Sequence, residues 1–383
     1  MTGSRLGGRL PTLAVFHVTI SALLAMALVS SAAYPLAVVA DSNGPDGAAA
    51  NFELKQLAEG VYGVIRKDPP GFMVDANDLF IINEDDVVVV DTNGAPSTTR
   101  LVLAALRKLT SKPVSYVINT HGHDDHIRGN VVYKEAFPGV QFIAHEKTRE
   151  ALLTVGESNR KSFLEGAPKF CSTLEDLVKT GKSLGGGELT AEERIAYESD
   201  VRLARLAINE APGAPAIIPT VTVSDRLTLY RGNRTIEIQY LGRGHTSGDL
   251  VVYLPQESIV ATGDLVVWPV PFTGSDQSHI GDWARTLERI CALNPKTIVP
   301  GHGPVLSDCS YLKTMAGLFA SIQQQADAAE SRGETLEQAR KSIKLDDFKQ
   351  KIAGDSTLRK LLFANYVAYP AVAAAYQDAR QKK

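Results

Sequence analysis

The chain has 383 residues, of which 22% are charged and 44% hydrophobic, and its formal net charge is −3. A composition this apolar excludes an intrinsically disordered protein. The near balance of charge leaves no basic surface of the kind that binds nucleic acid or an anionic membrane. We therefore expect a globular protein, long enough for one elaborated domain or two smaller ones.

The N-terminal segment has the order of a secretory signal peptide. Residues 10–40 contain no Asp, Glu, Lys or Arg, two arginines precede them, and small residues follow the apolar run. We predict that residues 1–40 are a signal peptide, cleaved after Ala33 or after Ala40, and that the protein is periplasmic or secreted. The alternative is an uncleaved membrane anchor, because the uncharged run is long enough to span a bilayer.

The next part of the chain is expected to run from β-hairpins into alternating strands and helices. Residues 87–90 are four consecutive valines, which is typical of a strand buried on both faces. The pattern indicates an α/β layered fold and argues against an all-β one. The elements expected here are strands over residues 52–65 and 78–90, a helix over 96–109, a strand over 114–119, a helix over 129–137, a strand over 140–144 and a helix over 145–153.

A charged segment, residues 154–216, interrupts this alternation and is expected to be a helical insertion, with helical patterns at about 172–182 and 189–209. We predict one domain over 51–310 that contains this insertion, and a helical C-terminal extension over 311–383. The other expected elements are strands over residues 227–230, 235–240, 249–254, 258–262 and 296–299, and a helix over 282–293.

The three cysteines are an odd number, so at least one stays unpaired or pairs between chains. Cys291 lies in an apolar helical stretch and is expected to be a buried thiol. A pairing of Cys171 with Cys309 remains open. None of the three has the spacing of a zinc thiolate cluster.

Histidines gather in one short motif. Three of the eight lie within six positions, in the sequence His121-Gly-His123-Asp-Asp125-His126, at the end of an expected strand. Imidazoles two residues apart in a loop can converge on one metal ion, and Asp125 and His126 can then face a second one. Chance clustering of so few histidines into this pattern is improbable, so the motif indicates a metal site.

Three further motifs repeat the combination of a strand end with glycine. They are G-H-T around His245, G-D at Asp264 and G-H-G around His302. Strand ends are where open α/β folds place ligand groups, and glycine allows the backbone to bend and approach closely. Each motif alone is common in turns, but the four together in this order strongly indicate a metal centre.

The set resembles the metallo-β-lactamase superfamily: H-x-H-x-D-H, then G-H-T, G-D and G-H-G, over roughly residues 51–310. The resemblance implies an α/β fold, an αββα sandwich with the metals at one sheet edge, and a hydrolase with two zinc ions per chain. By position it implies His121, His123 and His245 as ligands of the first metal, Asp125, His126 and His302 as ligands of the second, and Asp264 as a bridge between them.

The same resemblance implies the chemistry. Two metal ions activate a shared water that attacks a carbonyl or phosphoryl centre, and Asp125 orients this water as well as binding metal. No serine or cysteine nucleophile is then needed, and no G-x-S-x-G motif is present. Asp91, at the end of the four-valine strand, matches a recurrent acidic position and is expected to support a ligand without binding metal itself.

Departures from the family pattern narrow the range of candidate substrates. The segment from Gly244 to Pro255 is similar to class B β-lactamases, but Asp264 and Val267 stand where one group of those enzymes has Cys and Lys. The bridging Asp instead resembles glyoxalase II and N-acyl homoserine lactonases. We expect hydrolysis of a small amide, lactone or ester, the β-lactam ring included. The alternatives are a mononuclear-iron persulfide dioxygenase of the same superfamily and a non-catalytic zinc-binding protein.

Four side chains near the motifs are candidates for substrate contact. Trp268 and Phe272 follow Asp264 in a proline-stiffened loop and are expected to line the substrate pocket, with a simply packed loop as the alternative. Arg128 and Arg243 each either meet an anionic substrate or are exposed and solvated. The helical insertion is either a lid over the site or helical padding.

Overall fold

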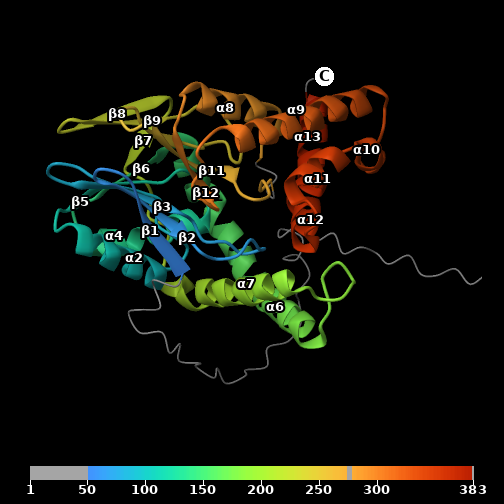
Figure 1. The fold of residues 1–383 in the computed structure, drawn as a ribbon, viewed down its shortest axis with the longest axis horizontal. Helices are drawn as coiled ribbons and strands as arrows, with labels where there is room; N and C mark the ends of the chain where they lie inside the picture. Colours follow the sequence, from blue (N-terminus) through green and yellow to red (C-terminus); the bar gives the residue numbers. More distant parts are fainter. Residues whose placement is uncertain (1–50, 274–277, 382–383) are drawn as a thin grey trace, which may run out of the picture.

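A computed structural model describes residues 51–273 and 278–381. The predicted signal peptide over residues 1–40, with its two candidate cleavage points, lies outside the described residues. Within the described part of the chain, none of the helices combines the length and the apolar character that crossing a membrane requires. Two β-sheets face each other, with α2 (Pro96–Leu109) and α4 (Asn130–Ala136) on one side of the pair and α8 (Ile280–Ala292) and α9 (Ser310–Ser331) on the other (Figure 1).

The first sheet has seven strands in chain order. Strands β1 to β4 are antiparallel, and β4 to β7 are parallel because helical crossovers connect them. The four valines of β4 are fully buried, as predicted. Alternate ones pack against the second sheet and against α2. The strands are β1 (Phe52–Ala58), β2 (Val61–Arg66), β3 (Asp78–Ile82), β4 (Val87–Val90), β5 (Val114–Ile118), β6 (Gln141–His145) and β7 (Val221–Val223).

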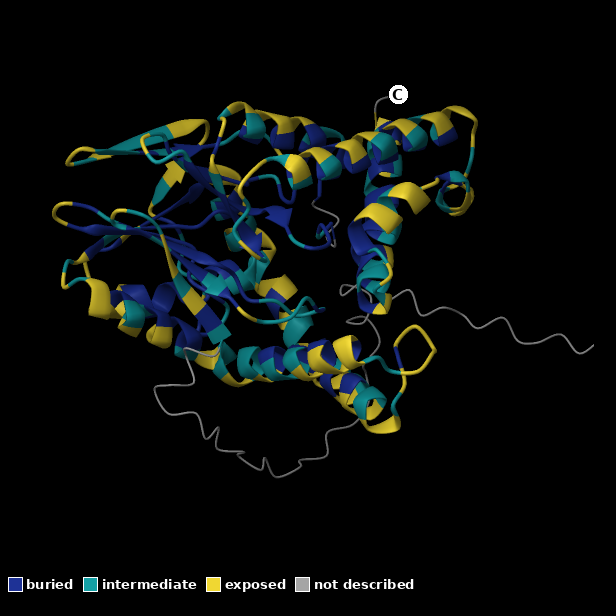
Figure 2. Cartoon of the chain, in the orientation of Figure 1, coloured by how far each residue is buried: buried dark blue, intermediate teal, exposed yellow. Residues whose placement is uncertain are grey.

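The second sheet has five strands in the order β12-β11-β10-β9-β8. Its outer face packs on α8 and α9 through a core that includes the fully buried Trp283 and Phe319, whose rings stack at 4.6 Å. Figure 2 shows the central strands of both sheets as buried, the edge strands as partly exposed and the outer faces of the helices as exposed. The strands are β8 (Arg226–Arg231), β9 (Arg234–Gln239), β10 (Val251–Leu254), β11 (Ile259–Val267) and β12 (Thr297–His302). The fold is therefore the expected αββα sandwich.

The insertion and the C-terminal extension are both helical, as expected. The insertion contains α6 (Gly156–Thr180) and α7 (Ala191–Glu210), and a capping box between Thr190 and Glu193 begins the second helix. The extension touches the insertion, since Ser356 donates a hydrogen bond of 2.6 Å to Glu192. After α9 its elements are α10 (Leu336–Ser342), α11 (Asp346–Ala353), α12 (Thr357–Phe363), η2 (Ala364–Ala368) and α13 (Tyr369–Gln381).

Two expectations about the strands were wrong. The short strand β7 has no alternating pattern of its own and was not predicted; it forms by pairing with β6. The strand expected to end at residue 262 continues to Val267, so Asp264 lies inside β11 and not after it. The pairing of β11 with β12 shifts around Gly263, which has a φ of +51°, and this irregularity hid the rest of the strand in the sequence pattern.

The expectation for Cys291 was also wrong. Cys291 forms a disulfide with Cys309, because α8 packs against α9 and brings the two Cα atoms to 6.0 Å. Cys171 is the buried free thiol, so a Cys171–Cys309 pair is excluded as well. Cys291 is only partly buried, and the apolar pattern around it carries no information about which helix lies opposite.

Replacing both Cys291 and Cys309 with serine is expected to lower the free energy of unfolding by about 3 kcal/mol, because the disulfide restricts the unfolded chain over a loop of this size. Urea denaturation without reductant measures the change. Dithiothreitol supplies the control, since it should destabilise the unaltered protein and leave the double variant unaffected. Equal stability of the two proteins without reductant would contradict the pairing.

Candidate metal centre

Four separate segments bring the predicted ligands to one edge of the sheet pair. The His121 motif follows β5 and enters the short helix α3 (Asp124–Ile127), and His245 lies in the loop between β9 and β10. Asp264 lies within β11, and His302 is the last residue of β12. Residues separated by up to half the chain thus meet at one place, as the family resemblance implied.

The ligand residues form two groups that could each hold a metal ion. In each group, one nitrogen or oxygen atom from every residue lies within 4.8 Å of the others. The first group is His121, His123, His245 and Asp264, and the second is Asp125, His126 and His302. All seven predicted ligands are therefore brought together, in the grouping that the sequence indicated. That they bind metal stays a prediction.

Asp264 faces both groups with different oxygens. Its Oδ2 lies 3.5 Å from His245 Nε2, in the first group. Its Oδ1 lies 3.2 Å from His126 Nε2 and 3.2 Å from His302 Nε2, in the second. A carboxylate placed in this way is suited to bridge two cations.

The polar atoms at the centre lack partners within the protein. Among the described residues, the buried atoms His121 Nε2, His126 Nε2, His302 Nε2 and Asp264 Oδ1 have no hydrogen-bond partner. Burying such atoms unpaired is costly, and cations between them would satisfy all four. The donor set of imidazole nitrogens and carboxylate oxygens, without thiolate, suits zinc. The residues present therefore fit a pair of metal ions.

The other ring nitrogens of three ligands are held by fixed acceptors. His126 Nδ1 donates to Asp91 at 2.8 Å, His245 Nδ1 to the Phe272 carbonyl at 2.9 Å, and His302 Nδ1 to the Asp75 carbonyl at 3.1 Å. Each bond fixes the tautomer and the ring orientation, so that Nε2 keeps its lone pair for a metal. Asp91 thus has the supporting role that the sequence indicated, and does not itself belong to either ligand group.

The protonation states of the five histidines differ. Burial lowers the pKa of His245 to about 3 and also lowers the pKa of His121 and His123, so these rings are neutral, which is the form that binds a cation. Burial opposes the charge of His302 and His126 too, but the carboxylates of Asp264 and Asp125 raise the pKa of His302 to about 10 and that of His126 well above its usual range. Burial opposes the charge of Asp264, but His302 and His126 hold its pKa well below its usual range. A cation held by the second group would take the place of these protons.

Two glycines of the motifs are required by close packing. A Cβ atom on Gly301 would lie 2.1 Å from Asp264 Oδ1, and one on Gly263 would lie 2.3 Å from the Thr120 hydroxyl. Any larger residue would push the bridging carboxylate or the strand that carries it. The glycines of G-D and G-H-G thus allow backbone and carboxylate to approach closely, as the motifs indicated in general terms.

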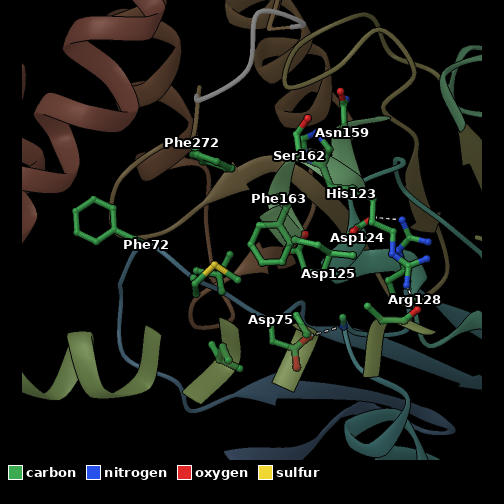
Figure 3. A pocket seen from close by; sticks show the side chains of 18 of the residues that line it. Phe72, Asp75, His123, Asp124, Asp125, Arg128, Asn159, Ser162, Phe163 and Phe272 are labelled. Carbon is green, nitrogen blue, oxygen red and sulfur yellow. Dashed lines mark hydrogen bonds and ion pairs between the residues drawn. The ribbon is translucent and has the colours of Figure 1, made fainter. Parts of the chain in front are cut away.

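A cavity of about 740 Å³ opens beside the two groups. His123 and Asp125 lie in its wall, and Figure 3 shows them between Phe72 on one side and Arg128 on the other. Most of the remaining wall is apolar and comes from α6, α7 and α13. The insertion and the C-terminal extension therefore shape the space next to the metal centre.

The four residues predicted to contact substrate lie in different environments. Phe272 lines the cavity, as expected. Trp268 does not line the cavity. Its backbone N–H donates to the His302 carbonyl at 3.1 Å, and its side chain lies beside Gly303, away from the cavity. Arg243 is half exposed and pairs with Asp282. Arg128 is buried in the cavity wall.

Sequence reasoning missed Asp75. This buried residue lines the cavity, its carbonyl orients His302, and its carboxylate accepts the Gly94 N–H at 2.8 Å. Arg66 lies 3.5 Å from the same carboxylate. The available signal was a pair of aspartates, Asp75 and Asp78, directly before a strand of apolar residues, but nothing in that segment indicates which distant histidine it meets.

The family model of the metallo-beta-lactamase superfamily matches residues 73–302, more than half of the chain. The chain belongs to the metallo-beta-lactamase superfamily. The matched range contains both ligand groups.

Among curated relatives in the superfamily, a linear primary-alkylsulfatase of Pseudomonas sp. (strain ATCC 19151) is 25% identical over 282 residues, which are 68% of this chain and 48% of that protein. A metallo-beta-lactamase type 2 of Bacillus cereus is 23% identical over 61% of this chain and 70% of its own length. This chain therefore spans about half the length of the alkylsulfatase.

Two solved structures from the superfamily are also similar. A metallo-beta-lactamase from Pontibacter korlensis aligns with a TM-score of 0.49 and 20% identity, over 70% of this chain and 98% of that one. The DIM-1 metallo-beta-lactamase aligns with a TM-score of 0.47 and 18% identity, over 70% and 97%.

Replacing Asp91 with Asn is expected to weaken zinc binding by about 10–100-fold, because an amide cannot accept from His126, the Thr120 N–H and the Thr120 hydroxyl at once. Competition with a chromophoric chelator measures the affinity, and circular dichroism checks the fold. Asp85→Asn removes an exposed carboxylate as a control and should change nothing. Unchanged affinity in a folded Asp91→Asn protein would overturn the role given to Asp91.

Proposed function

We propose that this protein is a dinuclear zinc hydrolase that cleaves a small ester, amide or lactone, with the β-lactam ring among the candidates. The observation that carries the proposal is the bridging position of Asp264, which contacts His245 with one oxygen and His126 and His302 with the other. A single-metal site would not need a buried carboxylate shared in this way.

Zinc, when bound, lowers the pKa of a coordinated water and polarises the substrate oxygen. The protein's part is to hold and orient the reactants. Asp125 contacts His126 and His302 through Oδ2, at 3.4 and 3.2 Å, and this leaves Oδ1 free to accept a proton or a hydrogen bond in the cavity. Its side chain is 24% exposed, whereas that of Asp264 is 2% exposed, so Asp125 is the carboxylate that a substrate can reach.

The names of the relatives guide the choice of test substrates. One relative is an alkylsulfatase and others are β-lactamases, so a primary alkyl sulfate and a β-lactam belong in the panel. The bridging Asp264, in place of a thiolate, supports adding a lactone and simple aryl esters. The panel therefore consists of dodecyl sulfate, nitrocefin, an N-acyl homoserine lactone and nitrophenyl esters.

Metal analysis of purified protein is expected to give two zinc ions per chain, and the zinc-loaded protein is expected to cleave at least one member of the panel. Asp264→Ala is expected to lose two-metal binding and activity together, since it removes the shared ligand. Val267→Ala, three residues further along the same strand, serves as the control. Retention of both metals at full activity in Asp264→Ala would remove Asp264 as the bridge.

Two other results would overturn the proposal. One iron per chain, with oxygen consumption on a persulfide, would instead support the dioxygenase alternative. Two zinc ions without cleavage of any panel member would show that the proposed substrate classes are wrong.

We also propose that the protein is exported. The uncharged segment over residues 10–40 supports this, and so does the Cys291–Cys309 disulfide, because disulfides persist in oxidising compartments. Expression of the full chain in a Gram-negative host should give periplasmic protein whose N-terminus is Tyr34 or Asp41. Full-length protein in the membrane fraction would support an anchor, and full-length protein in the cytoplasm would refute export.

A further inference from the structure

The cavity wall contains two buried guanidinium groups on the same side of the metal centre. Arg128 and Arg160 both line the cavity, and both are buried. Arg128 Nη1 donates to the Ala214 carbonyl at 3.1 Å, and Arg160 donates to the Ala211 carbonyl. The two charges also interact: burial and then the charge of Arg128 lower the pKa of Arg160, against smaller opposing effects of Asp124 and Glu157.

These two positive charges have too few partners within the protein. Asp124 pairs with Arg128 at 2.6 Å, but its side chain is 43% exposed. Among the described residues, no carboxylate forms an ion pair with Arg160, and the buried Nε of Arg128 has no hydrogen-bond partner. Adjacent buried cations repel each other, and an anion beside them would relieve the repulsion. Guanidinium groups are suited to bind carboxylate or sulfate oxygens.

Much of the remaining cavity wall is apolar. Phe163 of α6 and Leu206 of α7 line it together with Phe72, and Ala373 and Ala374 of α13 close it. Figure 3 shows Phe72 and Arg128 on opposite sides of Asp125. Most of these side chains are only partly buried, and a volume of about 740 Å³ suffices for a drug-sized ligand. An apolar part of a ligand would complete their burial.

We propose that the substrate is an anionic amphiphile: an ester or amide that joins an apolar chain to a part with a carboxylate or a similar anion. The anion binds Arg128 and Arg160, the apolar chain lies against Phe163 and Leu206, and the bond between them reaches Asp125. The anion is thus a recognition group and not the group that is cleaved. This rests on the proposed hydrolase function; hydrolysis adds the water oxygen to the acyl carbon and a proton to the leaving oxygen or nitrogen.

Four esters separate chain length from charge. They are 4-nitro-3-octanoyloxybenzoate and its butanoyl counterpart, which carry a carboxylate, and 2-nitrophenyl octanoate and butanoate, which do not. With zinc-loaded protein, kcat/KM is expected to rise by about tenfold or more with the longer chain, and by about tenfold or more with the carboxylate. Equal values for all four esters would refute the inference while leaving the hydrolase function in place.

Variants test which residues bind the anion and which bind the apolar chain of the substrate. Arg160→Met is expected to raise KM for the carboxylate esters about tenfold and to leave the neutral esters within about twofold, because it removes a charged hydrogen-bonding group that belongs to neither ligand group. Arg205→Met is the matched control, since Arg205 lies on α7, is 58% exposed and pairs with Glu175 outside the cavity. Leu206→Gln should slow only the octanoyl esters. A purely structural role for Arg160 would change all four esters alike.

Binding decides the inference if no ester is cleaved. Calorimetry of the zinc-loaded protein with 4-nitro-3-octanoyloxybenzoate should then show binding that Arg160→Met weakens about tenfold, while Arg205→Met does not. Absence of binding would refute the inference, whereas binding without cleavage would refute only the proposed reaction. If Arg160→Met does not fold, the comparison of charged and neutral esters in the unaltered protein still decides.

Discussion

The buried carboxylate of Asp264 is the constraint on which the rest of the structure depends. Its two oxygens face different histidine groups, and a charge so deeply buried is stable only with cations around it. Four segments of the chain must therefore meet at one point. The local irregularities of the second sheet serve this meeting: β11 kinks at Gly263, and Gly301 leaves room for the carboxylate.

A site residue could be predicted from the sequence where its signal lies in a short local motif, and could not where its role depends on a residue far away in the chain. The ligands were predictable because His121 to His126 are adjacent and the other motifs each carry their own glycine. Asp91 was predictable because it ends a strand of buried valines. Asp75 was not, because its role is a carbonyl contact to His302 across 227 positions, which leaves no local pattern.

The same holds for the fold: elements with a local sequence pattern were predictable, and features that depend on distant contacts were not. Helix α2 matches its expected bounds because its apolar positions recur on one face, whereas β7 exists only through pairing with β6. The Cys291–Cys309 disulfide depends on the packing of α8 against α9. Trp268 does not line the cavity; the sequence shows that a residue is near a ligand, but not in which direction its ring points.

The segment at Gly71 to Met73 links the cavity to both helical additions. Asp200 of α7 accepts the N–H groups of Phe72 and Met73, and Tyr366 of η2 donates to the Gly71 carbonyl at 2.9 Å. During synthesis all the predicted metal ligands are present once residue 302 has been made. At that point the segment at Gly71 to Met73 still lacks its hydrogen bond from Tyr366. The predicted ligand set is thus complete in the chain before Tyr366, which holds this segment, and α13, which supplies part of the cavity wall, have been made.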